Sequence, residues 1–136
     1  MDITQLRADL IRDEGVRLKP DEDSRGILTL GVGRNIEEVG ISQAEADLML
    51  DNDIAKVTAT LDKAFPWMQT LSEPRQRALA NMCFNLGFSK LLGFRQMLNA
   101  LKAGDYMEAS KQALDSEWSR QVGDRSHRIA LQFING

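Results

Sequence analysis

Two carboxylates near the N-terminus have residue types and spacing that suit acid–base chemistry. Glu14 is followed nine positions later by Asp23, and Thr29 comes six positions after that. Cleaving a glycosidic bond takes an acid that protonates the leaving oxygen and, commonly, a second carboxylate that activates water or stabilises the cationic transition state. Two such residues also occur by chance on most protein surfaces. Their meaning therefore depends on the elements that position them.

A first helix is expected to carry Glu14 at its end. Asp2 can cap this helix, with Gln5 as the reciprocal partner, and the apolar residues recur at helical spacing. Gly15 suits the left-handed position after the last turn. The partial negative charge at a helix C-terminus disfavours an ionised carboxylate, so Glu14 is suited to hold a proton. Asp23, in a polar turn, should remain ionised.

The segment 16–35 predicts a hairpin or a small sheet, because a β-forming run is interspersed with glycines. Gly26 can adopt the positive φ of a turn, and Gly31 and Gly33 allow another group to approach the backbone closely. Asp23 and Thr29 then lie on opposite arms of the hairpin. From there they can converge with the helix end.

The rest of the chain predicts helices. Ser42 and Glu45 form a capping box before a long helix over about 43–64, and Ser72 precedes a strongly apolar helix closed by Gly87. Further helices are expected at about 93–103, 106–114 and 125–134. The fold class is therefore α+β, predominantly helical.

Length and composition indicate one compact domain. The chain has 136 residues, of which 43% are hydrophobic and 27% charged, as in an ordinary globular protein. Its single cysteine, Cys83, lies in an apolar run and is expected to be a buried thiol. With His127 the only histidine, no closed zinc ligand set is available, and we expect neither a metal nor another cofactor.

The charge pattern argues against two classes of partner. Residues 1–70 hold 8 Lys/Arg and 14 Asp/Glu, whereas residues 71–136 hold 9 and 6, and no basic cluster of a nucleic-acid binder is present. The charged N-terminus lacks the apolar stretch of a secretory signal or membrane helix. We expect synthesis in a cytoplasm and no stable membrane association.

Several motifs together resemble the T4-type phage lysozymes (glycoside hydrolase family 24). The resemblance begins with Arg12-Asp13-Glu14-Gly15, Asp23 and the run 28–33. It continues through the run 80–87, Gly93-Phe94, Ser116-Glu117-Trp118 and Arg125, and so covers nearly the whole chain.

This resemblance implies a single bilobed lysozyme domain over residues 1–136. A small sheet-bearing lobe at about 13–42 would be joined by a long helix at about 43–64 to a helical lobe formed by about 65–136 with 1–12. The family is a muramidase family whose members hydrolyse the β-1,4 bond between N-acetylmuramic acid and N-acetylglucosamine in peptidoglycan. Glu14 would be the general acid, Asp23 would activate the water that Thr29 holds, and the anomeric carbon would be inverted.

Weaker assignments and two departures follow from the same resemblance. Arg125 matches an arginine that reaches the catalytic glutamate, Phe84 an aromatic residue of the cleft, and Gln112 a polar sugar contact. Asp21 stands where many relatives carry an aromatic residue, and its extra charge should favour protonation of its neighbours. Arg34 stands where some relatives have histidine, so a histidine salt bridge is not expected.

Other functions remain open. A lytic transglycosylase cleaves the same bond without water, and a wall-binding homologue keeps the fold without the chemistry. A small helical protein binding nucleic acid or a partner helix would need a basic stripe or an exposed apolar groove. On the lysozyme reading we expect a monomeric endolysin that meets peptidoglycan after a holin has permeabilised the membrane.

Overall fold

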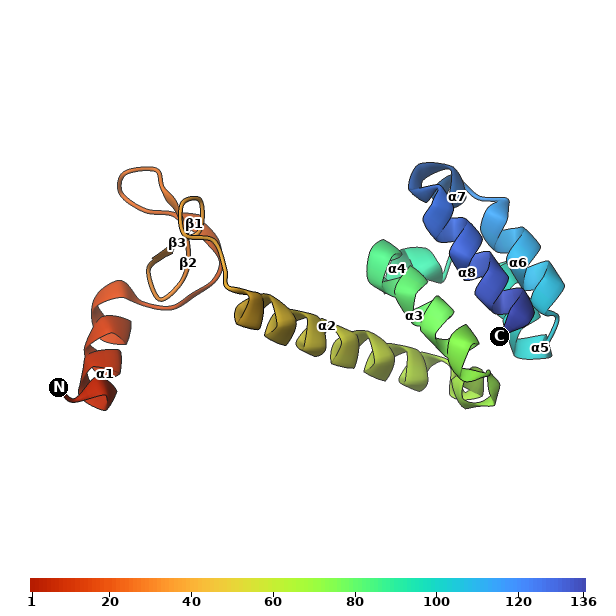
Figure 1. Cartoon of the computed structure of the whole chain (residues 1–136), viewed down its shortest axis with the longest axis horizontal. Helices are drawn as coiled ribbons and strands as arrows, with labels where there is room; N and C mark the ends of the chain where they lie inside the picture. The colour runs from red at the N-terminus through yellow and green to blue at the C-terminus, as the bar shows by residue number, and fades with distance from the viewer. The chain divides into compact units, whose positions relative to one another are not determined.

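The computed structural model describes all residues, Met1 to Gly136, and divides into two compact units. Unit 1 is Met1–Leu48 and unit 2 is Met49–Gly136; the division falls inside α2 (Gln43–Ala64). Each unit is described by itself. Helices and a small antiparallel sheet make up the regular structure, which confirms the predicted α+β class (Figure 1).

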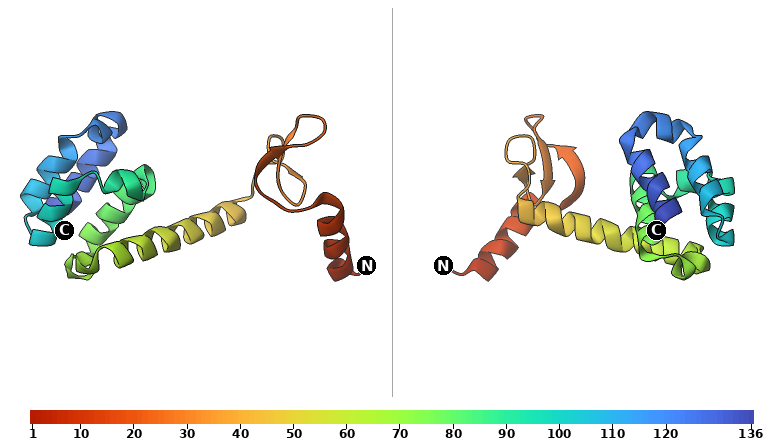
Figure 2. Two further views of the ribbon diagram at one scale, coloured as in Figure 1. Left: turned by 180° about the vertical axis from the view of Figure 1, so that it is seen from behind. Right: turned by 45° about the vertical axis from the view of Figure 1, so that its right-hand side comes forward.

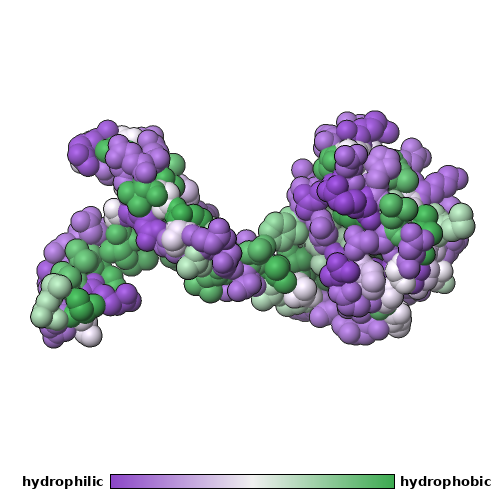
Figure 3. Space-filling model, in the orientation of Figure 1, coloured by the Kyte–Doolittle hydropathy of each residue, from purple (hydrophilic) through white to green (hydrophobic).

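Unit 1 begins with α1 (Ile3–Glu14), and its cap is partly as predicted. The Asp2 carboxylate accepts a hydrogen bond from Gln5 N at 3.0 Å, but the expected return bond is absent because the Gln5 side chain donates to Asp9 instead. Gly15 ends the helix at φ 72°, as predicted. The apolar residues of α1 are exposed within unit 1 (Figure 3).

The predicted small sheet follows and has three strands, β1 (Arg17–Glu22), β2 (Leu28–Gly31) and β3 (Arg34–Asn35). They are antiparallel in the order β1-β2-β3, and the right-hand view of Figure 2 shows strand arrows in this part of the chain. Asp21 pairs with Thr29, and the register shifts between Arg17 and Asp21. Pro20, which has no N–H to donate, lies in this irregular part of an edge strand.

The long helix α2 starts at the predicted capping box. Glu45 N donates to Ser42 Oγ at 3.1 Å, and Ser42 N donates to Glu45 Oε1 at 2.8 Å. The guanidinium of Arg34 also donates to Glu45, and together with the Ser42 bonds it lowers the Glu45 pKa to about 2. Arg34 therefore forms an ion pair with Glu45 at this position.

Unit 2 is a bundle of short helices packed around one apolar core (Figure 1). The helices expected after residue 64 are found as α3 (Glu73–Leu86), α5 (Arg95–Ala103), α6 (Tyr106–Leu114) and α8 (Asp124–Asn135). Three short elements were not predicted: η1 (Pro66–Thr70), α4 (Phe88–Leu91) and α7 (Glu117–Val122). Each is six residues or shorter, too short for a periodic pattern to reveal it.

The core of unit 2 draws on α3, as its apolar run predicts, and to the same extent on α5 and α8. The α3 helix buries Ala78, Leu79, Met82 and Cys83. Cys83 is a free, buried thiol, and burial raises its pKa. Trp118 is 5% exposed and belongs to this core, and its indole N–H donates to Oδ1 of the exposed Asn85 at 2.8 Å.

The end of α8 is fastened to the rest of unit 2 by Arg75. Its guanidinium lies 3.4 Å from the ring centroid of Tyr106 and donates to the carbonyl oxygens of Phe133 and Ile134.

No helix of the chain is both long and apolar enough to span a membrane. The predicted grouping of residues 1–12 with the helical lobe stays a prediction.

Candidate active site

Glu14 lies in the last turn of α1, and its side chain is exposed within unit 1. Its carboxylate rests against Gly33, in the turn between β2 and β3. A methyl group on Gly33 would come within 2.8 Å of Glu14 Oε2 and 3.0 Å of its carboxyl carbon. Gly33 also has φ 67°, a conformation that glycine adopts without strain. The helix end and the sheet therefore meet at Glu14 and Gly33.

Asp23 closes the hairpin between β1 and β2 through its backbone and its side chain. Its Oδ1 accepts hydrogen bonds from Arg25 N at 2.8 Å and Ile27 N at 3.0 Å. Both bonds lower the Asp23 pKa, and the bond from Ile27 N has the larger effect. Desolvation acts in the opposite direction but is outweighed. The carboxylate is thus held ionised, as the sequence predicts.

Thr29 lies on β2, opposite Asp21 of β1. Its hydroxyl donates a hydrogen bond to the carbonyl oxygen of Asp21 at 3.0 Å. Because the hydroxyl proton is engaged, the lone pairs of Thr29 Oγ1 remain available to accept a hydrogen bond from water. The arrangement suits a residue that holds a water molecule.

The effect expected of Asp21 on its neighbours stays a prediction, because the causes that shift the Asp23 pKa lie in other groups. The Asp23 pKa is lowered chiefly because two backbone N–H groups bind its carboxylate. The Asp21 side chain is itself exposed and lies 3.6 Å from the Arg17 guanidinium. Asp21 contributes its carbonyl oxygen to Thr29, and any residue type supplies that group.

Arg125 and Phe84 both lie in unit 2 and line one cavity of 480 Å³. The Arg125 Nε donates to Asn81 Oδ1 at 2.9 Å, so an amide from α3 orients the guanidinium. Phe84 is 46% exposed, and it belongs to the cavity wall rather than the core. The predicted roles of both residues stay predictions.

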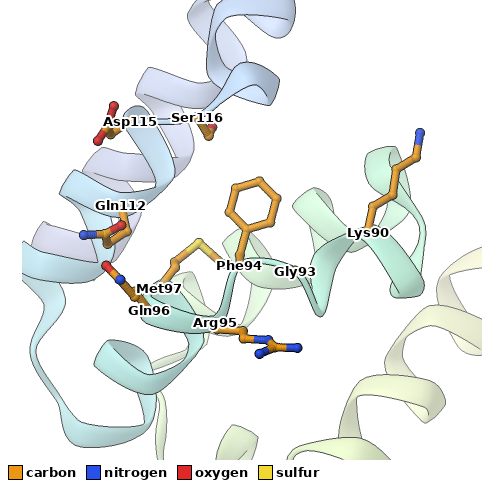
Figure 4. A pocket seen from close by; sticks show the side chains of 9 residues that line it. All are labelled: Lys90, Gly93, Phe94, Arg95, Gln96, Met97, Gln112, Asp115 and Ser116. Atoms are coloured by element: carbon orange, nitrogen blue, oxygen red, sulfur yellow. The ribbon is translucent and has the colours of Figure 1, made fainter.

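Gln112 borders a separate cavity of 570 Å³ between α5 and α6 (Figure 4). Its side-chain amide donates to Glu108 at 2.7 Å. Figure 4 shows Gln112 beside Gln96 and Met97, with Asp115 and Ser116 above and Phe94 rising between them and Lys90. Its predicted sugar contact also stays a prediction.

A metal site would need several side chains that bind one ion together. No group of three or more His, Cys, Asp and Glu side chains is arranged to hold an ion. The chemistry that the arrangement supports is acid–base chemistry at carboxylates. Glu14 abuts the sheet that carries an ionised Asp23 and a hydroxyl ready to hold water.

The sequence profile of the phage lysozyme family matches residues 12–131. The chain belongs to the phage lysozyme family. Membership places it among the peptidoglycan-degrading glycoside hydrolases, and the resemblance inferred from the motifs is confirmed.

Individual relatives of this phage lysozyme agree with the profile. The SAR-endolysin of Escherichia phage Mu is 32% identical over 96% of this chain and 80% of its own length. Probable T4-type lysozyme 1 of Dictyostelium discoideum is 24% identical over 98% of this chain and 96% of its own. The pre-baseplate central spike protein of Enterobacteria phage T4 is 31% identical over 93% of this chain, which spans only 27% of that protein.

Two residues of this phage lysozyme matter more than the motif analysis suggested. Gly33 was expected only to allow a close approach, and the group that approaches it is the Glu14 carboxylate. Asn81 was part of a matching run, and it orients Arg125. An amide within the apolar run 78–84 is the signal that marks Asn81.

Proposed function

We propose that this phage lysozyme is an endolysin with muramidase activity. It would hydrolyse the β-1,4 bond between N-acetylmuramic acid and N-acetylglucosamine in peptidoglycan and so lyse the bacterial host. The observation that carries this proposal is the contact of Glu14 with Gly33, because it sets a proton-donating carboxyl against the sheet that bears Asp23 and Thr29.

Each residue has one task in the proposed reaction. Glu14 gives its proton to the glycosidic oxygen as the bond from that oxygen to the anomeric carbon breaks. A water molecule that donates a hydrogen bond to Thr29 Oγ1 attacks the same carbon and passes a proton to Asp23. The two backbone N–H groups keep the Asp23 carboxylate ionised before this step. Attack from the side opposite the leaving group inverts the anomeric configuration.

Three further residues are proposed in supporting roles. Arg125, oriented by Asn81, is proposed to assist catalysis, and Phe84 and Gln112 are proposed to contact the glycan. We further propose that the protein acts as a monomer and reaches the wall after a holin has opened the inner membrane.

Product analysis tests the reaction. Purified Gram-negative sacculi are digested with the protein, and the muropeptides are examined by mass spectrometry for reducing or anhydro ends. Reducing ends, with the α-anomer seen first by NMR, are expected from an inverting muramidase. Anhydro ends would identify a lytic transglycosylase instead, and no release by folded protein would identify a wall-binding homologue.

A further inference from the structure

A third cavity of unit 2, of 290 Å³, combines core residues with exposed polar side chains that have no part in the proposed chemistry. Phe65 and Trp67 form one wall at η1, and Arg95, Asn99 and Lys102 line the α5 side. We call it the Trp67 pocket. None of the residues assigned to the reaction lines it.

The aromatic wall is rigid and only partly covered. Phe65, 8% exposed, stacks on Trp67 with ring centroids 4.9 Å apart and an interplanar angle of 26°. Trp67 itself is only partly buried against the core. The indole N–H of Trp118 donates to Asn85, whereas that of Trp67 meets no acceptor within the chain. A flat apolar surface with one unused donor therefore faces the pocket.

The opposite wall carries two unneutralised cations. Arg95, Asn99 and Lys102 follow one another at four and three positions, so they share one face of α5 with the amide between the cations. Neither cation takes part in an ion pair. Arg95 also borders the Gln112 cavity, but Figure 4 shows its side chain directed away from the other residues there.

We propose that the Trp67 pocket is a second, non-catalytic binding site for an anionic amino-sugar strand, the glycan of the cell wall. A sugar ring presents an apolar C–H face to the indole, and its N-acetyl group suits the Asn99 amide. The carboxylates that muramic acid carries, on its stem peptide in the intact wall and on its lactyl group once the peptide is removed, suit Arg95 and Lys102, which stand about 10 Å apart along the helix axis. Binding there would hold the enzyme on the wall between cleavage events.

The identity of this ligand rests on the proposed function, but its chemistry rests on the pocket. A polyphosphate is the less suitable anion, because its closely spaced charges need a cluster of cations and Arg95 and Lys102 are the only cations that line the pocket. A neutral chitin strand would leave Arg95 and Lys102 without partners. The anionic glycan is the ligand that uses every group present.

The test measures binding without cleavage. The full chain carrying Glu14→Gln is sedimented with purified Gram-negative sacculi, alone and with Lys102→Gln or Trp67→Leu added. Each added substitution is expected to weaken binding about tenfold, the effect of losing one charge-assisted contact or the stacking surface. Lys111→Gln removes an equally exposed, unpaired charge outside the pocket and should leave binding unchanged.

A second readout locates the ligand. In 1H–15N spectra the Trp67 indole signal should shift on addition of wall glycan stripped of peptides, which keeps its lactyl carboxylates, and much less with neutral chitohexaose. The inference is overturned if neither added substitution weakens binding to sacculi. It is also overturned if Lys102→Gln weakens binding only to anionic vesicles or single-stranded DNA and not to sacculi. If wild type still lyses walls, the proposed function survives that result. If it neither lyses nor binds them, both fail.

Discussion

At the scale of single residues, the two carboxylates proposed as acid and base lie in different surroundings. Asp23 is held ionised by backbone N–H groups, whereas Glu14 receives no such bonds and rests against a glycine. Residue type alone does not make this division, because both are carboxylic acids. The roles proposed for them rest on the helix end and the hairpin turn in which they lie.

Gly33→Ala tests the contact that places Glu14. The new methyl group would stand 2.8 Å from Glu14 Oε2 and displace the carboxylate, so wall lysis is expected to fall at least about tenfold. The positive φ at Gly33 adds a stability loss of about 1–2 kcal/mol. Turbidity clearing of permeabilised cells and thermal unfolding measure the two effects.

Gly104→Ala is the matched control for Gly33. Gly104 has φ 80° and nothing within 4 Å of an added methyl group. It should lose similar stability and keep full activity. Equal activity losses in the two variants would show that Gly33 acts through stability alone.

Asp23→Asn tests the backbone bonds to the Asp23 carboxylate through their pH dependence. Because the folded pKa lies below the unfolded value of about 3.9, the carboxylate stabilises the fold above that pH. The stabilisation is lost as pH falls toward the folded pKa. The melting temperature of wild type should therefore exceed that of Asp23→Asn near neutral pH, with the gap closing below about pH 4. A gap that stays constant down to pH 2 would contradict the assignment.

At the scale of elements, a capping side chain marks the start of half of the α-helices, namely α1, α2, α6 and α7. Ser42, Asp105 and Ser116 each accept a hydrogen bond from the backbone N–H three residues on. Ser72 occupies the same position before α3 but makes no such bond, and its buried hydroxyl has no partner. The same residue type thus stabilises some helices and not another.

Ser116→Ala and Ser72→Ala form a pair of substitutions that separates these cases. Losing the Ser116 cap of α7 is expected to lower the free energy of unfolding by about 1 kcal/mol. Removing the unpartnered hydroxyl of Ser72 should leave stability unchanged or raise it. Urea unfolding measures both, and a Ser72→Ala loss equal to that of Ser116→Ala would contradict the distinction.

The sequence predicts elements well where periodicity and caps agree. The helix over 43–64 and the glycine-rich sheet are found where expected. The sequence did not predict η1, α4 and α7, because one or two helical turns leave no periodic pattern of apolar residues. At the site, residue types indicated Glu14, Asp23 and Thr29, but only coordinates show that Gly33 meets Glu14 or that Asn81 orients Arg125.

At the scale of the whole molecule, the buried core belongs to unit 2. Every buried side chain lies between Leu61 and Phe133, and unit 1 buries none of its own. The sheet that carries the candidate chemistry is thus built from turns, caps and backbone pairing rather than from a core. Substitutions in the core of unit 2 should therefore dominate global stability.

Leu79→Ala tests where the stability lies. Leu79 is fully buried, and losing its side chain is expected to cost about 2–5 kcal/mol. Leu18→Ala, at a residue 89% exposed in unit 1, should change stability by no more than about 0.5 kcal/mol. Denaturant unfolding compares the two, and a comparable loss from Leu18→Ala would contradict this account.

The most direct test of the central claim is wall lysis by Glu14→Gln beside Asp13→Asn. The neighbouring Asp13 pairs with Arg12 on the exposed side of α1 and has no part in the proposed chemistry. Wild type and Asp13→Asn should release muropeptides with reducing ends, and Glu14→Gln, equally well folded, should release none. Undiminished release by Glu14→Gln would show that Glu14 is not the acid.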